Sequence, residues 1–101
     1  MPSGVMIVES SPSSGRDTPA YHDWYENTHI PEMLRIEGFV SARRLESLDG
    51  GTFLVIYEIE GDPEKAKAAL SEAQASGKLS RPEGVRLDPP PTVRYLRQIG
   101  E

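Results

Sequence analysis

Residues 39–60 read FVSARRLESLDGGTFLVIYEIE, two strand-like runs that are joined at Asp49-Gly50-Gly51. Asp-Gly between two runs rich in β-branched and aromatic residues is a strong signal for a β-hairpin, because glycine adopts the positive φ angles that tight hairpin turns need. We therefore predict antiparallel strands over 39–48 and 52–60, and we expect this hairpin to lie at the centre of the fold.

The segment before the hairpin has the pattern of a helix. Thr18 is a suitable N-cap, and Pro19 then takes the first helical position, where its missing N–H costs nothing. Pro31 disfavours helical geometry in the residue before it, so we expect this helix to end by Ile30. A further turn over 31–38 leads into the hairpin.

A second helix is predicted after the hairpin. Asp62-Pro63-Glu64 again combines an N-cap, a proline at the first position and an acid in the first turn. Ala66, Ala69, Leu70 and Ala73 then recur at helical spacing up to a stop at Gly77.

Two further strands, over 4–9 and 92–99, complete the order βαββαβ, which is the ferredoxin-like split βαβ arrangement. A long, proline-closed connection over 78–91 precedes the last strand. We thus expect one α+β domain over residues 1–101, with a four-stranded antiparallel sheet and two helices on one face.

Composition excludes several classes of function. The chain has 101 residues, no cysteine, a formal net charge of -5 and 11 scattered basic residues, so cysteine chemistry, thiolate metal sites and nucleic-acid binding are not expected. Its longest apolar run, over 53–57, is far shorter than the roughly 20 residues that span a membrane. The N-terminal sequence lacks the pattern of a secretory signal, and we therefore expect a cytoplasmic protein.

The run FLVIY over 53–57 is apolar on both faces of its strand. Two helices cover only one face of a sheet, so another body must cover the second face. A homodimer that packs sheet against sheet is the simplest solution. The alternative is that the connection over 78–91 folds over that face.

Residues 21–33 concentrate aromatic residues and both histidines of the chain. On a helix, Tyr21, Trp24 and Tyr25 share one face, and Trp24 is expected to belong to the core. Tyr25 and His29 are spaced i, i+4 at the edge of that face, so their phenol and imidazole can converge on one cavity between helix and sheet.

His29 precedes Ile30-Pro31 and is therefore expected at the C-terminus of the helix. There it could cap free carbonyl groups, or it could transfer protons in the cavity, and the sequence leaves both roles open. The helix dipole would raise its pKa and burial would lower it. His22 lies roughly 10 Å away along the axis, too far to share an ion, so we predict no metal site.

Arginine and tyrosine on the strands complete the candidate site. Alternation places Phe39, Ser41, Arg43 and Leu45 on one face of their strand, and Val40, Ala42 and Arg44 on the other. One arginine must therefore point inward, with Glu58 on the next strand as a candidate partner. Tyr95 and Arg97 share one face of the last strand and could line the same cavity or a dimer interface.

The run WYENTHIPEMLRIEGFVSARR over 24–44 resembles the signature of the dimeric α/β-barrel superfamily, in particular of EthD-like proteins. The resemblance implies a dimeric α/β barrel and a pocket between helix and sheet, with His29 as a general acid or base and Tyr25 beside it. Arg44 matches a basic position of the motif. Relatives of this kind include cofactor-independent monooxygenases, polyketide cyclases and isomerases.

Two functional hypotheses follow. The first is a small enzyme without metal or cofactor, in which His29 moves a proton on a hydrophobic carbonyl compound, such as an aromatic or polyketide-like one, while Tyr25 orients it. Tyr21, Trp24, Arg44 and Tyr95 are then predicted to contact the substrate. The second is a non-catalytic binding or accessory protein that uses the same pocket.

Overall fold

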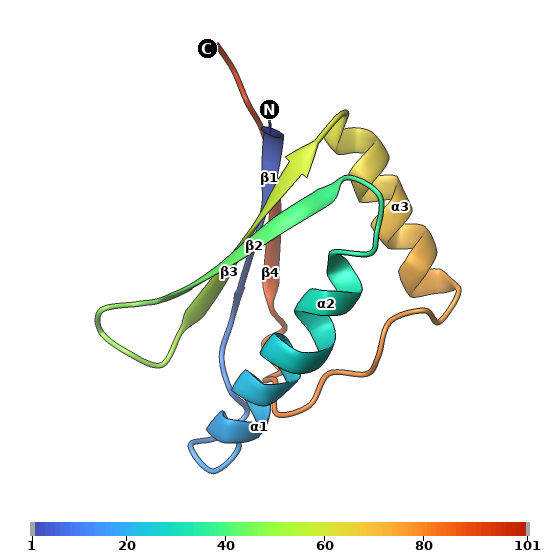
Figure 1. Ribbon diagram of the computed structural model, residues 1–101. Helices are drawn as coiled ribbons and strands as arrows, with labels where there is room; N and C mark the ends of the chain where they lie inside the picture. Colours follow the sequence, from blue (N-terminus) through green and yellow to red (C-terminus); the bar gives the residue numbers. More distant parts are fainter. Residues whose placement is uncertain (1, 101) are drawn as a thin grey trace.

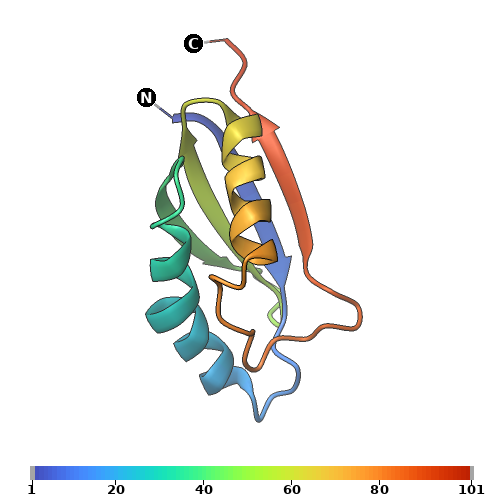
Figure 2. The same cartoon turned by 90° about the vertical axis from the view of Figure 1, so that its right-hand side faces the viewer.

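The computed structural model describes residues 2–100, which form a four-stranded antiparallel sheet with all helices on one of its faces (Figures 1 and 2). The strands pair in the order β2-β3-β1-β4, as in a ferredoxin-like fold, and the predicted α+β class is confirmed. The elements are β1 (Pro2–Ser10), α1 (Thr18–Trp24), the π-helical turn η1 (Tyr25–His29), α2 (Ile30–Met33), β2 (Phe39–Glu46), β3 (Phe53–Glu60), α3 (Pro63–Ala75) and β4 (Thr92–Arg97).

The hairpin is present as predicted, but it does not lie at the centre of the sheet, because β2 is an edge strand and the two central strands are β3 and β1. Strands β2 and β3 pair antiparallel, and the Ser47 backbone N–H donates to the carbonyl of Thr52 at 3.0 Å to close the turn. Gly50 and Gly51 have φ angles of +80° and +84°, a region that glycine enters without a steric penalty. The Asp-Gly signal therefore identified the turn for the correct physical reason.

The first helical segment is longer than predicted. It continues without a break from Thr18 to Met33, so the expectation that it ends by Ile30 is wrong. The turn Tyr25–His29 is π-helical, and the Ile30 N–H donates to the carbonyl of Tyr25, five residues back. This wider turn makes room for the ring of Pro31, which would otherwise press on the preceding turn and break the helix.

The two helix starts differ in how well their caps were predicted. The first helix is preceded by Asp17 at the N-cap position rather than Thr18, and the Asp17 side chain makes no capping bond to the helix. Asp62 caps α3 as predicted, because its carboxylate accepts a hydrogen bond from the Glu64 N–H at 2.9 Å.

A β-bulge changes the faces of β2. The register shifts between Phe39 and Ser41, so that Phe39 pairs with Ile59 and points into the core with only 2% of its surface exposed. The prediction that Phe39 shares a face with Ser41 is therefore wrong, because simple alternation does not hold across a bulge. Val40, the extra residue, is 48% exposed.

The core lies between the sheet and the helices. It is built from side chains of the strands, the helices and the connection over 78–91, namely Met6, Tyr21, Trp24, Tyr25, Met33, Phe39, Val55, Tyr57, Ile59, Ala66, Leu70 and Val85. Burial of this apolar surface is the main force that fixes the helices against the sheet.

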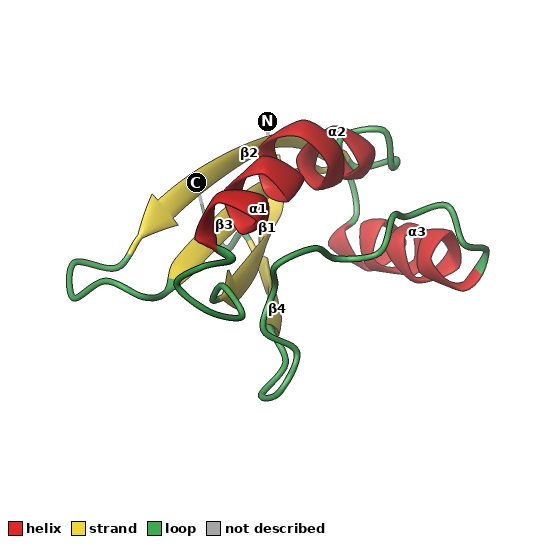
Figure 3. Ribbon diagram, turned by 90° about the horizontal axis from the view of Figure 1, so that it is seen from below, coloured by secondary structure: helices red, strands yellow, loops and turns green. Residues whose placement is uncertain are grey.

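The connection over 78–91 lies on the helix side of the sheet. It runs from the end of α3 back toward α1 before it turns into β4 (Figures 2 and 3). The Ser80 N–H and hydroxyl donate to the carboxylate of Glu32, and the Arg86 N–H donates to the carbonyl of Ser11 at 2.9 Å. The alternative that this connection covers the helix-free face is therefore wrong.

Within residues 2–100, nothing covers the helix-free face of the sheet. Leu45 and Leu96 are 42% and 38% exposed there, and the face also carries the half-buried side chains of Val5, Ile7, Leu54 and Ile56. In the same range, no helix has the length and apolar character that crossing a membrane requires.

Candidate functional site

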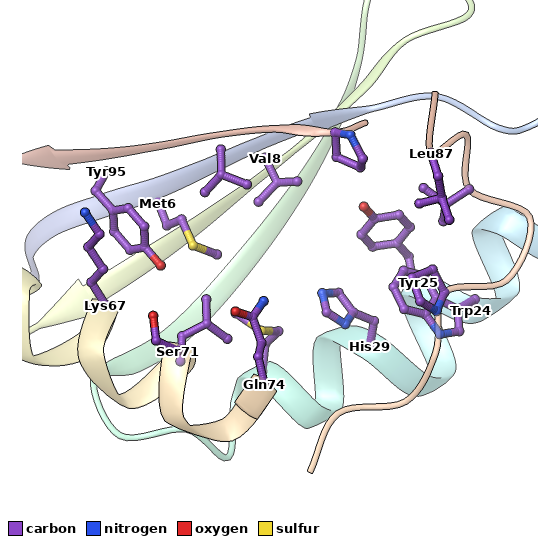
Figure 4. Close-up of a pocket in the computed structure, with 16 residues that line it drawn as sticks. Met6, Val8, Trp24, Tyr25, His29, Lys67, Ser71, Gln74, Leu87 and Tyr95 are labelled. Atoms are coloured by element: carbon purple, nitrogen blue, oxygen red, sulfur yellow. The ribbon is translucent and has the colours of Figure 1, made fainter. Parts of the chain in front are cut away.

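A cavity of about 400 Å³ lies between the sheet, the first helical segment, α3 and the connection over 78–91 (Figure 4). Its size is typical of small-molecule sites, which are concave and mostly apolar with a few polar groups. The side chains around it are those of Met6, Val8, Trp24, Tyr25, His29, Met33, Lys67, Leu70, Ser71, Gln74, Pro82, Val85, Leu87, Pro91, Val93 and Tyr95. Tyr25 and His29 thus share one cavity with Trp24 in its wall, which is where the i, i+4 spacing predicted them.

His29 lies inside the helical segment and not at its end. The helix continues through Ile30 to Met33, so the predicted C-terminal position and its capping role are wrong. The imidazole stacks on the indole of Trp24 with ring centres 4.4 Å apart. Burial lowers the pKa of His29 from 6.5 to about 4, against a smaller opposing effect of the Glu32 carboxylate. The imidazole is therefore neutral at pH 7, and burial outweighs the influences that would raise the pKa.

Two residues that line the cavity each have a ring nitrogen that is buried without a hydrogen-bond partner, namely Nε1 of Trp24 and Nδ1 of His29. Most buried polar atoms in proteins have a partner, and an unpaired one calls for a physical explanation. The indole N–H can only donate, whereas a neutral imidazole carries one donor and one acceptor nitrogen. Neither atom exposes surface to the cavity, so a ligand oxygen would reach them only after the rings move.

The phenol of Tyr25 is held from the sheet side. Its hydroxyl lies 3.0 Å from Oγ of Ser10, which also lies 2.7 Å from the hydroxyl of Tyr21. Burial raises the pKa of Tyr25 above its usual value of 10.0. The phenol therefore stays protonated at neutral pH and is fixed in direction, while its ring meets that of His29 edge to face at 5.6 Å.

Tyr21 and Arg44 lie outside the cavity, in contrast to their predicted contact with substrate. Tyr21 is completely buried. The guanidinium of Arg44 lies over the rings of Tyr21 and Tyr25, 5.7 and 5.1 Å from their centres, and neither Tyr21 nor Arg44 lines the cavity. Arg44 is the arginine that points inward, but its partner is Glu26 at 3.1 Å. Glu58 accepts a hydrogen bond from Ser41 on the opposite face, so the predicted pairing with Glu58 is wrong.

Of the two residues predicted on the last strand, Tyr95 lines the cavity and Arg97 does not, and α3 adds lining residues that were not predicted. Tyr95 lines the cavity beside Lys67, whose Nζ lies 5.4 Å from the centre of its ring. Lys67, Ser71 and Gln74 were not predicted, because the alanine and leucine stripe of α3 indicates only its core face. Their i, i+4, i+7 spacing, which borders that stripe, is the signal that could have found them.

No group of three or more His, Cys, Asp or Glu side chains within residues 2–100 is arranged to hold a metal ion. Comparison of the chain with protein-family models, with curated proteins and with solved structures found no match. The geometry of the site is therefore the basis for the functional proposal.

Proposed function

We propose that the protein is a small enzyme of the EthD-like type that acts on a hydrophobic, carbonyl-bearing molecule by acid–base chemistry of His29. The observation that carries this proposal is the single cavity whose wall contains the imidazole of His29 and the phenol of Tyr25 beside the indole of Trp24. The reaction class is that of a monooxygenase, cyclase or isomerase, all of which begin with proton transfer at an activated C–H or O–H bond.

In the proposed reaction, the residues of the cavity have separate roles. The neutral imidazole of His29 accepts a proton from the substrate. Tyr25, fixed by Ser10, orients the substrate from the other side. The apolar side chains of Met6, Val8 and Leu70 keep water from the reacting group.

The second candidate function, non-catalytic binding of the same kind of ligand, is favoured by one observation. A general base works best with a pKa near the working pH, and burial holds the pKa of His29 at about 4. Such an imidazole is a weak base, although it remains a good hydrogen-bond acceptor. The two candidates differ in whether the protein accelerates proton transfer.

Hydrogen exchange in D₂O measures that difference directly. Alkyl aryl ketones such as propiophenone lose an α-proton to a base and regain a deuteron from solvent, and proton NMR follows the loss of the α-signal. The enzyme hypothesis predicts a saturable acceleration of this exchange by the protein. Saturable binding of the ketones with exchange at the rate of buffer alone would contradict it and favour the binding protein.

We also propose that the protein is a homodimer in which two helix-free sheet faces pack together into a dimeric α/β barrel. The middle of this face carries the apolar side chains of Val5, Ile7, Leu54 and Ile56, which are left partly exposed. Side chains of this kind are usually covered, and a second copy offers a surface of matching size and character.

Sedimentation velocity tests the dimer. We expect a dimer at micromolar concentration, and Ile56→Lys is expected to shift the chain to monomer because it places a charge at the centre of the contact. Ala68→Lys, at an exposed position of α3 on the other side of the sheet, is the matched control. A wild-type chain that sediments as a monomer would contradict the proposal.

A further inference from the structure

The cavity has a charge opposite to that of the chain. The protein as a whole carries a formal charge of -5, with 16 acidic and 11 basic residues. Of the described residues that line the cavity, none is an aspartate or a glutamate, and Lys67 is the one that carries charge at pH 7 while His29 is neutral. The wall therefore favours an anion over a cation.

Lys67 is available for such an anion. Within residues 2–100 it forms no salt bridge, because Glu64, the carboxylate one turn earlier on α3, pairs with Arg97 at 3.6 Å. The Lys67 ammonium lies over the ring of Tyr95, 5.4 Å from its centre. A second pocket shares Lys67 and Tyr95 with the cavity and is also lined by Arg97 and Glu64, which pair with each other, so within the described part of the chain Lys67 is the unpaired cation at this end.

The polar groups of the cavity form a line from this cationic end toward His29. Lys67, Ser71 and Gln74 face the cavity from α3, and seven residues of helix correspond to about 10 Å along its axis. Gln74 and His29 also border one smaller pocket together, so the far end of this line reaches the imidazole. Figure 4 shows Lys67 and Tyr95 at one end of the cavity, and His29 and Trp24 at the other.

We propose that the ligand is an elongated hydrophobic carboxylic acid, with its carboxylate at Lys67 and its carbonyl group near His29, at the opposite end of the cavity (Figure 4). This inference rests on the proposed function, because it assigns a substrate class to the same cavity. The apolar body of the ligand lies against Met6, Val8 and Leu70, and Ser71 and Gln74 offer hydrogen bonds along its length.

The single tryptophan of the chain lies in the cavity wall, so its fluorescence reports binding. The probes are octanoate, 1-octanol and octylammonium, which share an eight-carbon chain and differ in charge. Titrations are compared for the wild type, for Lys67→Gln and for the matched control Lys65→Gln, an exposed lysine on the same helix that does not line the cavity.

We expect octanoate to bind more tightly than octylammonium to the wild type. Lys67→Gln is expected to weaken octanoate binding roughly threefold to fivefold relative to 1-octanol, which is the upper part of what one exposed ion pair contributes. Lys65→Gln should leave the ratio of octanoate to 1-octanol affinity unchanged. Added salt should reduce this ratio in the wild type and in Lys65→Gln, but not in Lys67→Gln.

Two results would overturn the inference. Octylammonium could bind as tightly as octanoate, or Lys67→Gln could leave the ratio of octanoate to octanol affinity unchanged. Either result leaves the proposed function intact, because neutral ketones would still bind beside His29. If none of the three probes changes the Trp24 emission at saturating concentration, the cavity is not a binding site and both proposals fail together.

Discussion

Replacing His29 by glutamine is expected to lower the protein-catalysed α-proton exchange of a bound ketone by about 10²- to 10⁴-fold, the usual contribution of a positioned general base. Glutamine keeps much of the size and hydrogen bonding of histidine but cannot take up the proton. Binding of the ketone, measured by Trp24 fluorescence, should change by less than about threefold, because one hydrogen bond can still form.

The matched control for this variant is His22→Gln, which removes the other imidazole of the chain. His22 packs against Tyr21 and Phe53 and does not line the cavity. Its replacement should leave the catalysed exchange within about twofold of the wild type. Undiminished exchange in His29→Gln would contradict the assignment of His29 as the base.

A second large effect concerns stability at acid pH. Burial holds the pKa of His29 at about 4 in the folded protein, whereas the imidazole of the unfolded chain titrates near 6.5. As the pH falls from 6.5 toward 4, the imidazole of His29 therefore becomes protonated in the unfolded chain but stays neutral in the folded protein. The folded state should lose about 3 kcal/mol of stability over this window, because a tenfold change in proton affinity corresponds to about 1.4 kcal/mol.

Urea denaturation at pH 7 and at pH 4 measures this loss, and His29→Gln isolates it from the titration of carboxylates. Glu32 also contributes to the loss in acid, because hydrogen bonds from Ser80 and, to a smaller extent, the charge of His29 lower its pKa; the part due to Ser80 is common to both proteins. The variant should lose less stability on acidification than the wild type by the amount given above. Equal losses in the two proteins would mean that His29 is not buried as a neutral group.

The fold was predictable because its signals are local. The Asp49-Gly50-Gly51 turn and the Asp62 cap each depend on a few neighbouring residues, and both formed as predicted. The errors arose where the backbone departs from regular geometry. The π-helical turn at Tyr25–His29 allowed the helix to pass Pro31, and the bulge at Val40 turned Phe39 into the core.

Part of the site was predictable from helical spacing, and part was not. The spacing of Tyr25 and His29 sufficed to place both on one cavity. The partner of Arg44 could not be deduced from strand alternation, because Glu26 reaches it from the helix and not from a neighbouring strand. Such long-range pairs depend on how the helix lies across the sheet, which local sequence does not determine.

The connection over 78–91 illustrates the same limit. Its prolines indicated an irregular segment, but they did not indicate which face of the sheet it follows. Gly84 fixes its course in three dimensions, because it has a φ angle of +71° and packs so tightly that a Cβ atom there would lie 2.8 Å from the backbone nitrogen of Tyr21. That contact holds Val85 and Leu87 on the helix side, where they form a wall of the cavity.

The most direct test of the site is the imidazole spectrum of protein that carries ¹⁵N-labelled histidine, recorded as an alkyl aryl ketone is added. The chain has 2 histidines, and His29→Gln assigns their signals. We expect the ring nitrogens of His29 to shift saturably with ketone while those of His22 stay in place, because only His29 lines the cavity. Signals of His29 that remain unmoved while the ketone binds would contradict the proposal that this cavity is the functional site.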